Sequence, residues 1–150
     1  MNSNLPIAYT ISGSDSSGGA GLQADLKVFS AFNVHGCSIT TAITAQNTAG
    51  IDHIMHVPNN LVLAQFNSLI SDLIPNVIKI GMLGKSVLSV GKIIRGISIP
   101  IVCDPVLSST SGEKLLDQNL FDNFKEIICP ECSILTPNIL EAKLLLNNHN

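Results

Sequence analysis

The sequence predicts an α/β fold of three layers, in which a mainly parallel sheet lies between two layers of helices. Short runs of apolar and β-branched residues alternate along the chain with stretches whose apolar residues recur at helical spacing. Five such pairs of strand and helix follow one another, and this alternation is typical of parallel strands joined by crossover helices. The 150 residues are also enough to bury the core of one domain.

The first pair contains a glycine-rich segment. Residues 7–12 (IAYTIS) are predicted as a strand, and Leu22, Leu26 and Phe29 are spaced as one face of a helix. Between them lies GSDSSGGAG, at 13–21, which is predicted as a turn. Because glycine lets a backbone approach a ligand closely, this turn is a candidate binding segment.

The second pair is interrupted by an ambiguous segment. Residues 37–46 (CSITTAITAQ) are rich in β-branched side chains and are predicted as a strand. Residues 50–57 fit either an edge strand or a flap. Apolar residues from Val62 to Leu73 then predict a helix, which Pro75 ends.

The last three pairs complete the predicted sheet. The expected strands are 77–81 (VIKIG), 99–103 (IPIVC) and 133–136 (SILT). The expected helices are 85–97, a helix through Leu116, Leu120, Phe124 and Ile127, and a helix from 138 to 146 that follows Pro137.

Small and polar residues stand directly after the predicted strands. In an open parallel sheet, ligands bind outside the carboxyl ends of the strands. Five segments should therefore line one cleft: 13–21, Gln46 with Asn47, 81–83, 104–106, and 136–138 with Glu141.

One group of these residues suits a flat ring. Gln46 and Asp25 offer hydrogen-bonding groups, while Met82 and Val106 offer apolar surface. Together with the glycines, these residues suit a small planar heterocycle that carries an amino group.

A second group suits phosphates. Asp104, Asn138 and Glu141 carry oxygen atoms of the kind that bind Mg²⁺ or its waters. A ring site beside such a group indicates a small-molecule kinase. The alternative is structural, because Asn138 and Glu141 could simply begin a helix, where a glutamate is favoured by the helix dipole.

Other nucleotide-binding motifs do not fit the turn. The last glycines are not followed by the Lys-Ser or Lys-Thr of a Walker phosphate loop. No acidic residue lies between Asp25 and Asp52 to bind the ribose of a dinucleotide. A Walker loop is therefore excluded, and NAD binding is disfavoured.

The composition of the chain argues against two classes of partner, nucleic acids and membranes. A net charge of −3 without a Lys/Arg cluster argues against nucleic acid. No apolar stretch reaches the roughly 18 residues that a transmembrane helix needs, and the first residues lack signal-peptide features. We expect a cytoplasmic protein with no membrane partner.

The CxxC pair Cys129 and Cys132 follows a helical pattern, so buried or linker thiols are expected rather than a redox or zinc site.

Four segments together resemble a known family. They are SGSDSSGGAGLQADLKVFSAFNVHGCSITTAITAQNT (12–48), KIGML (79–83), VCDPVLSSTSGEKLL (102–116) and LTPNILEAKLL (135–145). In this order, and over essentially the whole chain, they resemble the bacterial hydroxymethylpyrimidine/phosphomethylpyrimidine kinases of thiamine biosynthesis, which are ribokinase-like proteins.

The resemblance implies a reaction and a set of site residues. It implies transfer of a phosphoryl group from ATP, with Mg²⁺, to 4-amino-5-hydroxymethyl-2-methylpyrimidine and then to its monophosphate. The positions that match the family's pyrimidine pocket are Gly13, Ala20, Asp25, Gln46, Met82 and Val106. Those that match its Mg–ATP side are Asp104, Asn138 and Glu141, with Asp104 and Glu141 toward the metal.

One departure from the family pattern is expected to matter for catalysis. Family members carry a GTGC-type anion-hole loop with a catalytic cysteine or aspartate, but these 150 residues contain no Gly-Thr-Gly. Residues 1–150 are therefore expected to be the N-terminal portion of a single ribokinase-like kinase domain whose C-terminal part is missing, and no catalytic residue is assigned. A mean hydropathy of +0.38 agrees with apolar surface left uncovered.

Three functions stay open at this point. The first is the pyrimidine kinase, which the AQNT segment together with SGSDSSGGAG favours. The second is a pyridoxine or pyridoxal kinase of the same superfamily, and the third is a non-catalytic remnant that only binds a ligand or a partner. The resemblance also implies a homodimer.

Overall fold

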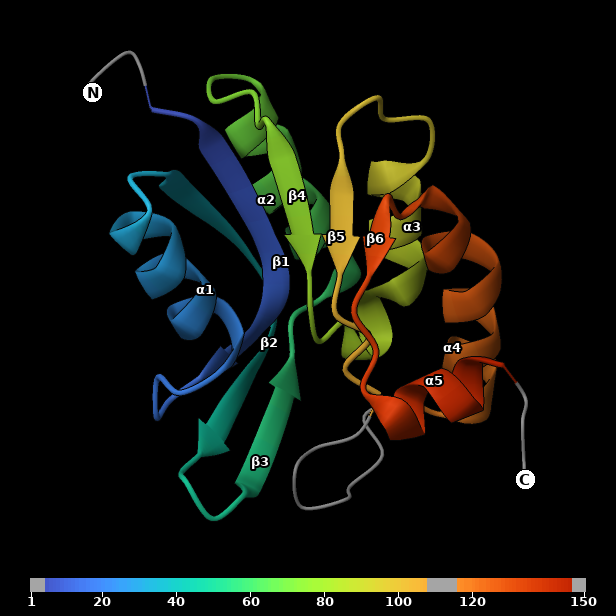
Figure 1. Ribbon diagram of the computed structural model, residues 1–150. Coiled ribbons are helices and arrows are strands. Elements are labelled where there is room, and N and C mark those ends of the chain that lie inside the picture. Colours follow the sequence, from blue (N-terminus) through green and yellow to red (C-terminus); the bar gives the residue numbers. More distant parts are fainter. Residues whose placement is uncertain (1–4, 108–115, 147–150) are drawn as a thin grey trace.

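The sheet is mainly parallel, as predicted, and has one more strand than the five predicted pairs. The computed structural model describes residues 5–107 and 116–146 (Figure 1). In this part of the chain the strand order is β3-β2-β1-β4-β5-β6, and only β3 runs antiparallel to its neighbour. The strands are β1 (Ile7–Asp15), β2 (His35–Gln46), β3 (Ile51–His56), β4 (Val77–Ile80), β5 (Ile101–Cys103) and β6 (Ile134–Leu135).

Helices cover both faces of the sheet, which confirms the three-layer prediction. Figure 1 shows α1 on one side of the sheet and α2 and α3 on the other. The α-helices are α1 (Gly21–Ala31), α2 (Asn59–Ile70), α3 (Val87–Ile94), α4 (Gln118–Asn123) and α5 (Ile139–Leu145). None of the helices within the described ranges is long and apolar enough to cross a membrane.

Side chains of the central strands alternate between the two faces. Ile11 of β1 and Ile80 of β4 are fully buried in the main hydrophobic core, which also contains residues of α2 and α3. Thr10 and Lys79 point to the opposite face, where both contact Asp25 of α1. The two-residue period of a strand thus places apolar residues in the core and polar residues under α1.

The ambiguous segment 50–57 is an edge strand. Asn47 holds the tight turn before it, because its side-chain oxygen accepts hydrogen bonds from Ala49 N at 2.8 Å and Gly50 N at 3.2 Å. The chain therefore reverses at once and β3 pairs antiparallel with β2. This turn explains the sixth strand.

The first strand is longer than predicted. Residues Gly13–Asp15 belong to β1 and pair with Ala42–Thr44 of β2 after a register shift between Ser12 and Gly13. The prediction that the turn begins at Gly13 is therefore wrong. Glycine and serine have low strand propensity, so the sequence did not indicate this extension of β1. Pairing with β2 stabilises it instead.

The helix predicted through Leu116 and Ile127 is also different. Leu116 precedes α4, which continues into a π-helical turn (Phe124–Ile128) and then a 3₁₀ turn (Cys129–Glu131). The wider π turn shifts the buried position from Ile127 to Ile128, which is fully buried. Ile127 instead lies close to α3, where a Cβ on Gly91 would be 2.4 Å from its Cγ2.

Apolar surface is exposed near the end of the described chain. Ile139 and Leu140 on α5 are 78% and 72% exposed, and Ile134 lies on β6, the outer strand of the sheet in the described part. This observation agrees with the expectation from hydropathy.

Candidate functional site

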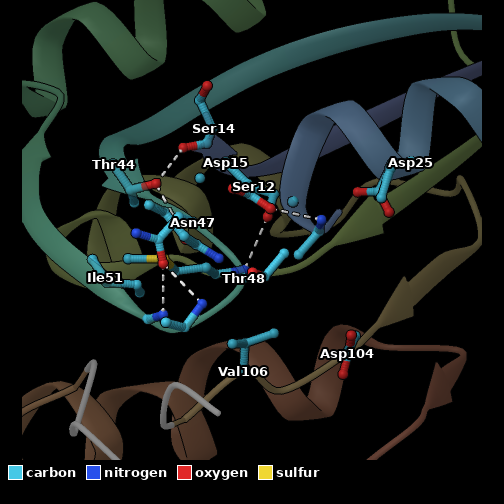
Figure 2. Close-up of a pocket in the computed structure, with 18 of the residues that line it drawn as sticks. Ser12, Ser14, Asp15, Asp25, Thr44, Asn47, Thr48, Ile51, Asp104 and Val106 are labelled. Atoms are coloured by element: carbon cyan, nitrogen blue, oxygen red, sulfur yellow. Dashed lines mark hydrogen bonds between the residues drawn. The ribbon is translucent and has the colours of Figure 1, made fainter. Parts of the chain in front are cut away.

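A cleft of about 340 Å³ lies at the carboxyl ends of β1, β2, β4 and β5 (Figure 2). Its volume is in the range of small-molecule sites. All six residues assigned to a pyrimidine pocket line it: Gly13, Ala20, Asp25, Gln46, Met82 and Val106. Asp104 lines it as well. Asn138 and Glu141 are not among its lining residues.

Met82 is held by its backbone on one side of the cleft. Its N–H donates to Ser12 Oγ at 3.1 Å, and its carbonyl accepts from Thr41 Oγ1 at 2.6 Å. A Cβ on Gly13 would lie 3.0 Å from Met82 Sδ. Gly13 therefore allows the thioether to lie directly against β1.

The glycine-rich turn is organised by Asp15. Its carboxylate accepts hydrogen bonds from the Ser17 hydroxyl and from the N–H groups of Ser17, Gly19 and Ala20, at 2.8 to 3.1 Å. Burial by itself would raise the pKa of the Asp15 carboxyl, but these hydrogen bonds outweigh it and lower the pKa below its usual value.

Asp15 also decides what the turn can bind. Backbone N–H groups in a glycine-rich turn form a site for an anion when they are free. Here those of Ser17, Gly19 and Ala20 already bind the protein's own carboxylate. The turn is therefore suited to supporting the wall of the cleft rather than to holding a phosphate.

The main chain of Gln46 is hydrogen-bonded to the glycine-rich turn. Ser16 Oγ donates to Gln46 O at 2.7 Å and accepts from Gln46 N at 2.8 Å. Thr44 Oγ1 donates to Ser14 O at 2.9 Å and lies 3.2 Å from Gln46 Oε1. These contacts fix the main chain at the end of β2, and Gln46 lines the cleft from there.

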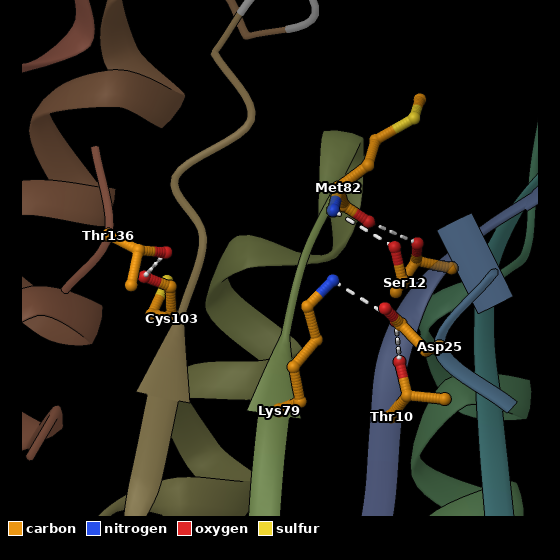
Figure 3. A network of polar contacts seen from close by, with 8 residues as sticks. Thr10, Ser12, Asp25, Lys79, Met82, Cys103 and Thr136 are labelled. Atoms are coloured by element: carbon orange, nitrogen blue, oxygen red, sulfur yellow. Dashed lines mark hydrogen bonds and ion pairs between the residues drawn. The ribbon is translucent and has the colours of Figure 1, made fainter. Parts of the chain in front are cut away.

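Lys79 is a cleft residue that the sequence reasoning missed. Its Nζ is 3.0 Å from Asp25 Oδ2, and Thr10 Oγ1 donates to the same oxygen at 2.6 Å (Figure 3). A lysine in a strand otherwise made of valine and isoleucine was the available signal, because burying a charge is costly unless it is paired.

Asn138 and Glu141 begin α5 as a capping box. Glu141 N donates to Asn138 Oδ1 at 3.0 Å, and Asn138 N donates to Glu141 Oε2 at 2.9 Å. Glu141 Oε1 accepts from Leu107 N at 3.4 Å. The helix-start interpretation is thus confirmed, while the role of both residues on an Mg–ATP side stays a prediction.

The cysteines take no part in the cleft. All four are free, and Cys129 and Cys132 are partly buried, as expected. Burial raises the pKa of the Cys129 thiol to about 11. A thiol with a raised pKa is a weak nucleophile near neutral pH.

The sequence matches a described family. Residues 15–150 match the sequence model of the family described as phosphomethylpyrimidine kinase. The chain is 43% identical over 141 residues to the hydroxymethylpyrimidine/phosphomethylpyrimidine kinase of Rhizobium meliloti, covering 93% of this chain and 53% of that protein. It is 41% identical over 143 residues to the Escherichia coli protein of the same description, covering 93% of this chain and 54% of that one.

Solved structures of kinases are also similar to the chain. The crystal structure of phosphomethylpyrimidine kinase from Clostridium difficile has a TM-score of 0.87 and 39% identity, over 95% of this chain and 63% of that chain. Pyridoxal kinase from Staphylococcus aureus, in complex with AMP-PCP and pyridoxal, has a TM-score of 0.80 and 30% identity, over 94% and 51%. The chain spans about half the length of the curated relatives it matches.

Proposed function

The chain belongs to the phosphomethylpyrimidine kinase family, and from this premise we propose that its cleft binds the pyrimidine substrate of a thiamine-pathway kinase. The substrate is 4-amino-5-hydroxymethyl-2-methylpyrimidine or its monophosphate. The observation that carries the proposal is that the six residues assigned from sequence to the pyrimidine pocket line a single cleft.

The cleft offers each part of such a ligand a chemical partner. Met82 and Val106 supply apolar surface for the ring faces, and Gly13 leaves room beside Met82. The Gln46 amide can hydrogen-bond to the amino group and the ring nitrogen next to it. This combination of apolar walls and few polar groups is usual for small-ligand sites.

In the proposed reaction, ATP supplies the phosphoryl group and the substrate hydroxyl oxygen accepts it. Asp104 lines the cleft beside Val106 and is the carboxylate that we propose faces Mg–ATP. No group of three or more His, Cys, Asp or Glu side chains within residues 5–107 and 116–146 could hold a metal ion. The part we assign to this cleft is binding and orienting the acceptor.

Pyridoxal phosphorylation is the second candidate. It is favoured by the structural similarity to a pyridoxal kinase that was solved with pyridoxal. The Rhizobium meliloti and Escherichia coli relatives, which have higher identity, are hydroxymethylpyrimidine/phosphomethylpyrimidine kinases, so the pyrimidine is preferred. The homodimer stays a prediction.

Replacing Gln46 by leucine is expected to weaken binding of the hydroxymethylpyrimidine by about 1 to 3 kcal/mol, because buried polar groups of the ligand lose their partners. The fold should change little, since Thr44 keeps its hydrogen bond to Ser14 O. The measurement is calorimetric titration of both proteins.

Gln118→Leu is the matched control for this substitution, because Gln118 is exposed on α4 and bonds Asp122 rather than the cleft. It should bind the pyrimidine as the unmodified chain does. Equal affinity of Gln46→Leu and Gln118→Leu would contradict the assignment of Gln46.

A further inference from the structure

Lys79 holds an unusual position in the cleft. Among the described residues that line it, Lys79 is the only one with a cationic side chain. The side chain is 22% exposed and that of its partner Asp25 is 17% exposed. Pairing with Asp25 explains how the charge is tolerated, but it does not explain why the ammonium faces the cleft.

The ammonium has more donors than the protein uses. A lysine carries three N–H donors. Within residues 5–107 and 116–146, the hydrogen bond of Nζ is the one to Asp25 Oδ2, an oxygen that also accepts from Thr10. Lys79 can therefore donate to a ligand without giving up its ion pair.

The backbone leaves space for this group. Gly81 lies two residues after Lys79 on the same face of the chain, and a Cβ there would be 2.9 Å from Lys79 Nζ and 2.5 Å from Ser12 Oγ. Any other residue at position 81 would press on both groups. The glycine thus keeps the ammonium at the edge of the cleft.

Lys79 and Gln46 approach the cleft from different sides. Gln46 ends β2 and Lys79 belongs to β4, and these strands lie on opposite sides of β1. A flat ring bound above β1 would therefore meet the two side chains at two different edges. In the proposed substrate, the second ring nitrogen lies opposite the carbon that bears the amino group.

We propose that Lys79 donates a hydrogen bond to the pyrimidine ring nitrogen opposite the amino-bearing carbon, while Gln46 binds the amino edge. This inference rests on the proposed function and adds a specificity residue to it. The acceptor is a neutral nitrogen rather than a phosphate, because Asp25 already balances the lysine charge. A phosphate dianion at Lys79 would also face the Asp25 carboxylate.

The test is a binding cycle between protein and ligand. Lys79→Met and the unmodified chain are titrated with the hydroxymethylpyrimidine and with its pyridine analogue, in which the ring nitrogen opposite the amino-bearing carbon is C–H. The pH is alkaline, so that both ligands are neutral. Each single change should weaken binding about 10- to 100-fold, and the two together should weaken it little further.

Two control variants locate the effect. In Gln46→Leu the analogue should still lose its full 10- to 100-fold, because Gln46 binds the other edge. Lys92→Met, an exposed position on α3, should behave as the unmodified chain does. The substrate monophosphate should lose as much affinity for Lys79→Met as the unphosphorylated ring does.

Additive losses in the cycle, or a loss confined to the monophosphate, would overturn the role of Lys79. If the unmodified chain fails to bind the pyrimidine, the proposed function fails instead. Should circular dichroism show that Lys79→Met is unfolded, the double variant Asp25→Asn with Lys79→Met, which leaves neither charge unpaired, is compared with Asp25→Asn in the same cycle. The same non-additivity is expected there, and additivity again contradicts the proposal.

Discussion

A polypeptide of residues 1–150 is expected to release ADP from ATP at the background rate when the hydroxymethylpyrimidine is added. Phosphoryl transfer depends on positioning and on stabilising the charge of the transferring group. We propose that the cleft supplies groups for the acceptor, but the 150 residues contain no Gly-Thr-Gly for an anion-hole loop. Loss of a single such donor can lower a rate about 100- to 1,000-fold, and here the whole loop is lacking.

The measurement is pyrimidine-dependent ADP release by this polypeptide. The comparison is the same chain joined to the remaining half of the Escherichia coli relative, which matches it over 54% of that protein. Turnover by residues 1–150 at a rate comparable to the joined chain would show that the cleft contains more of the catalytic machinery than we assign to it.

Gly21→Ala is expected to lower the free energy of unfolding by about 2 to 5 kcal/mol, the largest stability effect of a single substitution considered for the cleft. Gly21 has φ of +56°, and a residue with a Cβ in this left-handed conformation loses about 1 to 2 kcal/mol of folding free energy. Its Cβ would also lie 2.3 Å from Gly13 O, and overpacking of this kind costs about 1 to 3 kcal/mol. The backbone oxygen belongs to β1, so it cannot move aside without disturbing the strand.

Gly96→Ala separates the two causes. Gly96 has φ of +71°, but nothing lies within 4 Å of its Cβ position. Gly96→Ala should therefore lower the free energy of unfolding by about 1 to 2 kcal/mol, from backbone conformation alone. Urea unfolding measures both variants, and equal destabilisation would mean that the contact between Gly21 and Gly13 does not constrain the turn.

The sheet and the cleft were largely predictable from the sequence. Apolar runs and helical spacing are local signals, and the rule that ligands bind at the carboxyl ends of parallel strands then grouped distant residues. Gln46 and Val106, for instance, line the same cleft although 60 positions separate them. The glycine-rich segment 13–21 was a candidate from its composition, and the resemblance to a known family singled out Gly13 and Ala20 within it.

The features that could not be predicted from the sequence depend on pairing between distant segments. Lys79 contacts Asp25 across 54 positions, and no local pattern indicates which carboxylate a strand lysine meets. Gly13–Asp15 belongs to β1 only because β2 lies alongside. Glu141 shows the converse case, because one motif describes both a helix cap and a ligand for a phosphate-bound metal, and the structure shows the first.

The most direct test of the central claim is calorimetric titration of the chain with 4-amino-5-hydroxymethyl-2-methylpyrimidine and, separately, with pyridoxal. We expect one binding site per chain that prefers the pyrimidine, because we propose that Gln46 and the Lys79–Asp25 pair bind its two nitrogen-bearing edges. Binding of pyridoxal with equal or higher affinity, or no binding of the pyrimidine, would contradict it.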